Sequence, residues 1–151
     1  MTINSEMIGE ERMRVYLASP FFNDQELEAL KEIEQILDDK GLTVFKPREN
    51  QMEHLTTGTR HWSIETFMND KKFIDWAEVV VAVYHGNYSD SGTAFELGYA
   101  YGTNKPCIVI HLGDDSNLMV HEAAHANLTL EQLRDYDFNI MPSSFYEGKM
   151  I

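Results

Sequence analysis

The chain has 151 residues, the length of a single domain spanning 1–151, with 43% hydrophobic residues and a formal net charge of −13 at pH 7. This charge would repel a phosphate backbone, so we expect no nucleic acid partner and favour a neutral or cationic small substrate. No stretch approaches the roughly 18 apolar residues of a membrane helix, and we expect no membrane contact. The start of the chain has acids where a signal peptide would be basic and apolar, so residues 1–12 are expected to form a flexible extension. Cys107 is the one cysteine and lies in an apolar run, which favours a buried thiol in a cytoplasmic protein.

Strand-like and helix-like patterns alternate along the chain. The run EVVVAVY at 78–84 is continuously apolar, which is typical of a strand covered on both faces. In the helical segment 61–77, Ile64, Phe67, Met68 and Ile74 share one face. We expect strands at 13–18, 42–47, 78–84, 106–112 and 137–140, helices at 24–41, 61–77, 93–105 and 130–134, and an irregular tail. This alternation predicts an α/β sandwich with a mostly parallel five-stranded sheet.

In an open parallel sheet, ligands bind beyond the carboxyl ends of the strands. The segments expected there are SPFFND, KPRENQ, HGNYSDSGTAFE and GDDSNLM. The first has no glycine, so the sequence has neither a dinucleotide fingerprint nor a P-loop after its first strand. These loops are suited to a small molecule held by polar and aromatic side chains.

The segment SDSGTAFELGYA carries the strongest candidate for catalysis. Asp90 or Ser91 can cap a helix, Gly92 permits a tight turn, and Glu96 falls in the first turns, where the helix dipole favours an ionised carboxylate. Such a carboxylate can act as a nucleophile. The alternative is that Glu96 is only an acid near a helix start. Asp70 is a second candidate, with a solvated helix acid as its alternative.

The motif H-E-x-x-H occurs at His121, Glu122 and His125, and on a long helix this spacing holds zinc. Here it follows the loop-like GDDSN and precedes ANLTLEQ, which has no helical core face of its own. We therefore interpret the match as accidental, expect no metal site, and expect both histidines at the surface or an interface.

Six stretches together resemble the nucleoside 2-deoxyribosyltransferases, from about residue 13 to the end of the chain. They are VYLASPFF, ENQ, MNDKKFIDWAEVVVAVY, DSGTAFELGYAYGTNKP, NLM and FYEG. The element D-x-G-x-x-x-E-L-G-Y-A is also shared with related nucleotide N-hydrolases, and its combination with the other stretches is more specific. The resemblance implies a flavodoxin-like three-layer sandwich. It also implies exchange of the base on a 2'-deoxynucleoside through a covalent deoxyribosyl-enzyme intermediate, with retention of the β configuration and no cofactor.

The resemblance also implies roles for individual residues. Glu96 matches the nucleophile, Asp70 the acid that protonates the departing base, and Tyr16 the tyrosine that orients the nucleophile. The residues that match substrate-binding positions are Asp90 at the sugar 5'-hydroxyl, Asn117 from a neighbouring subunit, Gln51 at the base, Phe21, Phe22 and Trp62 as aromatic walls, and Met119 beside the sugar, with Gly92 at the turn. The family commonly ends on an aromatic residue after F-Y-E-G, whereas this chain ends Lys149-Met150-Ile151.

Three functions stay open on the sequence. The first is the transferase, whose partners are 2'-deoxynucleosides and free nucleobases and whose active unit is expected to be a homo-oligomer built from dimers, a hexamer by resemblance. The second is an N-glycoside hydrolase, in which water captures the sugar; Asp90 argues against a 5'-phosphate substrate because it would repel that group. The third is a non-catalytic nucleoside-binding module.

Overall fold

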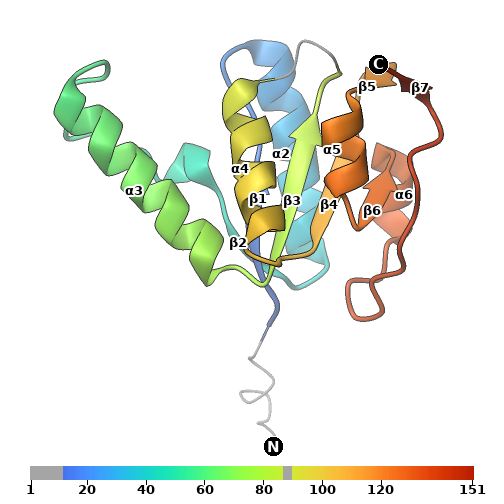
Figure 1. Cartoon of the computed structure of the whole chain (residues 1–151). Coiled ribbons are helices and arrows are strands. Elements are labelled where there is room, and N and C mark those ends of the chain that lie inside the picture. Colours follow the sequence, from blue (N-terminus) through green and yellow to red (C-terminus); the bar gives the residue numbers. More distant parts are fainter. Residues whose placement is uncertain (1–11, 87–89) are drawn as a thin grey trace, which may run out of the picture.

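The structure, a computed structural model, describes residues 12–86 and 90–151 (Figure 1). Most of the expected N-terminal extension, residues 1–11, lies outside the described residues. The elements in chain order are β1 (Arg14–Ala18), α2 (Asp24–Asp39), β2 (Thr43–Phe45), the 3-10 turn η1 (Pro47–Glu49), α3 (Arg60–Trp76), β3 (Val79–Tyr84), α4 (Ser91–Gly102), β4 (Cys107–His111), β5 (Asp115–Ser116), α5 (Leu118–Ala123), β6 (Ala126–Leu128), α6 (Leu130–Asp135) and β7 (Lys149–Met150).

The main sheet has five strands in the order β2-β1-β3-β4-β6, and every neighbouring pair is parallel. This is the strand order of a flavodoxin-like doubly wound sheet, and it confirms the expected α/β class. The central strand β3 is buried along its whole length, as its unbroken apolar run predicts. No helix within residues 12–86 and 90–151 combines the length and apolarity needed to cross a membrane.

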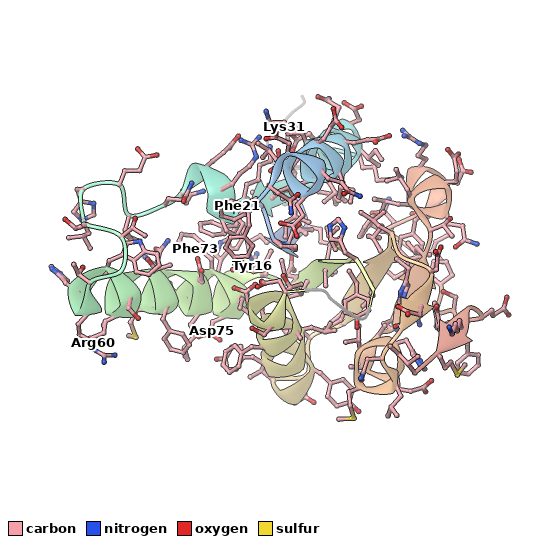
Figure 2. All side chains as sticks on the ribbon, turned by 90° about the horizontal axis from the view of Figure 1, so that it is seen from above. Tyr16, Phe21, Lys31, Arg60, Phe73 and Asp75 are labelled. Atoms are coloured by element: carbon pink, nitrogen blue, oxygen red, sulfur yellow. The ribbon has the colours of Figure 1, made fainter. Side chains whose placement is uncertain are left out.

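Strand β1 shows how the sheet separates two cores. Val15 and Leu17 belong to the core that α2 and α6 cover, whereas Tyr16 and Ala18 belong to the core against α3, α4 and α5. Successive side chains of a strand point to opposite faces, so the position of Tyr16 in β1 aims its ring at the α4 side. Figures 1 and 2 show α2 on one face of the sheet and α4 on the other.

Helix α3 is less buried than its apolar pattern suggests. Its N-cap Thr59 accepts a hydrogen bond from the backbone N–H of Trp62, and Ile74 near its end is buried. Ile64, Phe67 and Met68, which share a face with Ile74 in the sequence pattern, are exposed. Figure 1 shows the reason, because the first turns of α3 lie apart from the sheet.

The expected strand at 137–140 is wrong. The fifth strand is β6, whose register pairs Ile108 with Ala126 and Ile110 with Leu128. Around Asp137 the chain instead turns, with the Asp137 side chain accepting from the N–H of Asn139 and its backbone oxygen accepting from that of Met141. Phe138 is buried in the core all the same, so its apolarity reflects packing from a turn.

The segment after β4 is also more ordered than expected. Asn117 caps the short helix α5 by accepting a hydrogen bond from the N–H of Met119, where a loop was expected. Strand β7 pairs in parallel with β5, so the tail expected to be irregular contributes a two-stranded sheet. The short helix expected at 130–134 is confirmed as α6, with a capping box formed by Thr129 and Gln132.

Candidate active site

A hydrogen bond between β1 and α4 forms the centre of the candidate site. The hydroxyl of Tyr16 donates to Oε2 of Glu96 at 2.7 Å. Tyr16 is fully buried, and its ring stacks on Phe45, which in turn stacks on Phe73 at centroid distances of 5.6 and 4.0 Å. Figure 2 labels Tyr16 and Phe73 near the middle of the molecule. The aromatic stack therefore fixes the hydroxyl that holds the Glu96 carboxylate.

The position of Glu96 in α4 favours its ionised form less than the sequence suggested. Glu96 is the sixth residue of α4, beyond the first turn in which the dipole acts. Burial raises its pKa to about 7, and the repulsion of Asp70 and Asp90 acts in the same direction, while the bond from Tyr16 opposes both. The pKa of the Tyr16 hydroxyl is itself raised by burial and by Glu96 and Asp70, so it remains a donor.

Asp70 lies on α3 opposite Glu96, and both line one pocket between α3 and α4. The pocket has a volume of about 340 Å³, and its other lining residues are Phe67, Lys71, Ile74, Gly92, Phe95 and Tyr99. Burial raises the pKa of Asp70 to about 6, because the apolar surround penalises its charged form. A carboxyl with this pKa can hold a proton near neutral pH and donate it.

Asp90 and Gly92 shape the start of α4 beside this pocket. Asp90 is the N-cap, and its Oδ2 accepts from the backbone N–H of Thr93 at 2.9 Å and from the Thr93 hydroxyl at 3.1 Å. A Cβ on Gly92 would come within 3.0 Å of that same Oδ2. A side chain at position 92 would therefore crowd the cap, which accounts for a glycine at this place.

The remaining sequence candidates do not line the pocket that holds the two carboxylates. The rings of Phe21 and Phe22 stack on each other at 6.3 Å, and Phe22 is 80% exposed. Gln51 follows η1, and Trp62 lies in the first turn of α3. Asn117 and Met119 lie at the start of α5, and Met119 is 74% exposed.

The H-E-x-x-H match does not have the geometry of a zinc helix. Helix α5 ends at Ala123 and Ala124 is extended, so His125 does not continue the helix that carries His121. His121 is buried with its ring stacked on Tyr146, and Nε2 of His125 contacts the backbone oxygen of Met141 at 2.7 Å. The expectation that both histidines lie at the surface or an interface is therefore wrong for His121, which packs in the interior of the chain. Within the described ranges, no group of three or more His, Cys, Asp or Glu side chains is placed to hold a metal ion.

Several pocket residues were missed by the sequence analysis. Phe67 and Ile74 stand three positions before and four after Asp70, and Tyr99 stands three after Glu96. Residues at these spacings share a helix face, so helical geometry around the two carboxylates could have identified them. The stacked Phe45 and Phe73 come from separate elements, and only the tertiary fold brings them to Tyr16.

Comparison with known proteins identifies the family. The family model for nucleoside 2-deoxyribosyltransferase matches residues 15–134. A solved structure of a 2-deoxyribosyltransferase from Bacillus psychrosaccharolyticus is 38% identical, covers 89% of this chain and 99% of that chain, and has a TM-score of 0.84. The nucleoside deoxyribosyltransferase of Lactobacillus leichmannii is 26% identical over 89% of this chain and 95% of its own.

A more distant structure, the CMP N-glycosidase of Clostridium botulinum, is 18% identical with a TM-score of 0.51, and covers 82% of this chain and 94% of its own. At this identity the likeness concerns the fold alone. The family match, by contrast, spans most of the chain and includes Tyr16, Asp70 and Glu96. The chain therefore belongs to the nucleoside 2-deoxyribosyltransferase family of enzymes.

Proposed function

We propose that this enzyme moves the 2-deoxyribosyl group from a 2'-deoxynucleoside to a free nucleobase through a covalent deoxyribosyl-Glu96 intermediate. The observation that carries the proposal is the Tyr16–Glu96 hydrogen bond at a pocket that Asp70 also lines. Glu96 supplies a nucleophile, one oxygen of which accepts a hydrogen bond from the neutral Tyr16 hydroxyl. Asp70 supplies a carboxyl with a pKa of about 6 that can protonate a leaving group.

In the first step, the ionised Glu96 attacks C1' of the sugar as the bond from C1' to the base nitrogen breaks. The electron pair of that bond goes to the base, and Asp70 gives the base its proton. In the second step, a nitrogen of the incoming base attacks C1', the bond to Glu96 breaks, and the proton of the incoming base passes to Asp70. Each step inverts C1', so the product retains the β configuration.

The hydrogen bond from Tyr16 favours the ionised form of Glu96. Its hydroxyl donates to the carboxylate and lowers the pKa of Glu96 against the effect of burial. The transition state has positive character at C1' and negative character on the base, so an ionised Glu96 and a protonated Asp70 stabilise both ends.

Substrate binding is proposed to use Asp90, which lies beside the pocket at the start of α4, together with residues that do not line the pocket of their own chain. Oδ2 of Asp90 is occupied by the helix cap, which leaves Oδ1 for the sugar 5'-hydroxyl. Gln51 hydrogen-bonds the base, and Met119 lies against the sugar. The aromatic walls are Phe21, Phe22 and Trp62.

We further propose that the active unit is an oligomer built from dimers, as a hexamer, in which Asn117 completes the site of a neighbouring subunit. Two groups of apolar side chains are exposed: Ile64, Phe67, Met68, Phe95 and Tyr101 on α3 and α4, and Leu118 and Met119 on α5. Apolar groups of this extent are typical of protein interfaces. A second copy that covers them would also close the pocket between α3 and α4.

One assay tests the proposed reaction. Incubation of a deoxynucleoside with a second free base, and without it, is followed by chromatography of the products. A new deoxynucleoside that requires the second base supports transfer. Release of free base alone indicates hydrolysis, and an unchanged substrate indicates a binding module; either result contradicts the proposal.

A further inference from the structure

Two ion pairs connect the turn after β2, which comprises η1 and its flanking residues Lys46 and Asn50, to helix α2. The guanidinium of Arg48 forks around the Glu34 carboxylate, with Nε at 3.2 and 2.9 Å from its two oxygens and Nη2 at 2.6 Å from Oε1. Nζ of Lys46 lies 2.7 Å from Oδ2 of Asp38. Glu34 and Asp38 stand one helical turn apart on α2, so both ends of the turn are anchored to one face of that helix.

The Arg48–Glu34 pair is the buried member of the two. Glu34 is 4% exposed, the most deeply buried carboxylate of the part of the chain that the structure describes. A buried ion pair is weak evidence for a gain in stability, because removing both charges from water is costly. Its established use is to select one geometry among alternatives, and the two-point fork of arginine suits that use.

The side chain of Gln51 is bonded to the backbone of the same turn. Nε2 of Gln51 donates to the backbone oxygen of Arg48 at 3.1 Å, and Nδ2 of Asn50 donates to that of Lys46 at 2.8 Å. The amide nitrogen of Gln51 is thus directed into the turn. The amide oxygen, on the other side of the group, can accept a hydrogen bond from a ligand.

We propose that Arg48, held by Glu34, is a positioning residue for base recognition: it fixes the turn so that Gln51 presents an acceptor to a base that carries an N–H donor. The inference rests on the proposed function, in which Gln51 contacts the base. Arg48 itself does not touch the substrate. The site selects bases that carry an N–H donor on the edge that faces Gln51.

The test compares two acceptor bases, adenine and purine, which differ by one exocyclic amino group. The measured quantity is the ratio of kcat/KM for adenine to that for purine. This ratio does not depend on how much of a variant is folded, because both bases meet the same active molecules. The variants are Gln51→Ala, the double variant Glu34→Leu with Arg48→Met, and the triple variant that combines them. The double variant leaves no unpaired buried charge.

The wild-type enzyme is expected to prefer adenine, and the Gln51 variant and the double variant are each expected to lower the ratio by about tenfold, the value of one good hydrogen bond. The triple variant is expected to lower it no further, because both changes remove the same contact. The control is Glu32→Gln with Arg134→Gln, which removes an exposed ion pair that ties α2 to α6. This control should keep the wild-type ratio.

Three results would overturn the inference: a double variant with the wild-type ratio, effects that add in the triple variant, or a wild-type enzyme without preference between the two bases. Failure of the proposed function gives a different result, since the wild-type enzyme would then make no new deoxynucleoside from either base. The single variant Arg48→Lys keeps the positive charge but loses the two-point contact with Glu34. It is therefore also expected to lower the ratio.

Discussion

The environment of Glu96 has two opposing effects on its pKa. Its burial beside Asp70 and Asp90 raises the pKa to about 7, and the Tyr16 hydroxyl acts against that rise. A nucleophile must be ionised to attack, and its burial strengthens every interaction with the developing charge at C1'. The residue types and the family motif predict Glu96 as the nucleophile, and this role stays a prediction. The pKa could not be predicted, because it depends on packing that only the fold defines.

The pH dependence of kcat/KM should follow from these two carboxyls. The reactive form needs Glu96 ionised and Asp70 protonated, with pKa values of about 7 and about 6. We expect a bell-shaped profile with its maximum between these values, and the two limbs belong to the coupled pair. In Asp70→Asn, measured with a base that leaves without protonation, the alkaline limb should disappear and the rate should rise with pH to a plateau. An alkaline limb that persists in this variant would remove Asp70 from the role of acid.

The same burial predicts how stability depends on pH. The folded protein binds the Glu96 proton more tightly than the unfolded chain, since its pKa is raised from 4.5 to about 7. The stabilising contribution of this proton is complete at pH values below 4.5 and is lost as the pH rises through about 7. Glu96→Gln should therefore stabilise the fold at pH 8, by at most about 3 kcal/mol for this shift. Urea unfolding at pH 5 and pH 8 measures this, with Glu28→Gln on the exposed face of α2 as the control. An equal free energy of unfolding for wild type and Glu96→Gln at pH 8 would contradict it.

At the scale of elements, the length of a segment decided what the sequence could predict. The helices α2, α3 and α4 are long enough for their apolar residues to show a helical period, and β3 and β4 are recognisable as unbroken apolar runs. Strand β6 has three residues and β7 has two, so neither carries a pattern, and tertiary pairing alone defines them. Phe138 misled the assignment because a buried aromatic in a turn resembles part of a strand.

The end of α5 leads to a prediction about metal. The two histidines of the H-E-x-x-H match do not share a helix face, because the helix ends at Ala123. Exhaustive treatment with a chelator, followed by removal of the chelator, should therefore leave base exchange unchanged. Activity that is lost on chelation and restored by stoichiometric zinc would contradict this, and metal analysis of the untreated protein provides the control.

At the scale of the whole molecule, two observations support the proposed shared site: apolar side chains are exposed on α3, α4 and α5, and Asn117 is not among the residues that line the pocket. Asn117 caps α5 and does not line the pocket of its own chain that holds Asp70 and Glu96. Sharing of the site between subunits stays a prediction of the family resemblance. Which apolar side chains stay exposed could not be predicted from their helical pattern, because Ile64, Phe67 and Met68 share a face with the buried Ile74.

Shared sites predict complementation between inactive variants. Glu96→Ala and Asn117→Ala each remove one contributor to every site, so each homo-oligomer should be inactive. Co-expression should restore about a quarter of wild-type sites, because half of random dimers are mixed and one of their two sites is intact. Separately purified and unmixed variants are the control. A fully active monomer, established by light scattering at the assay concentration, would contradict the shared site.

The covalent role of Glu96 is the central claim, and one measurement tests it most directly. A 2'-fluoro-substituted deoxynucleoside destabilises the oxocarbenium-like transition states, so it should slow turnover and trap the sugar on the nucleophile. The trapped enzyme is digested, and the peptides are sequenced by mass spectrometry. The account predicts the added sugar on Glu96, and no added sugar in Glu96→Gln under the same conditions. Sugar found on Asp70 or Asp90, or a Glu96→Gln enzyme that exchanges bases at near the wild-type rate, would contradict it.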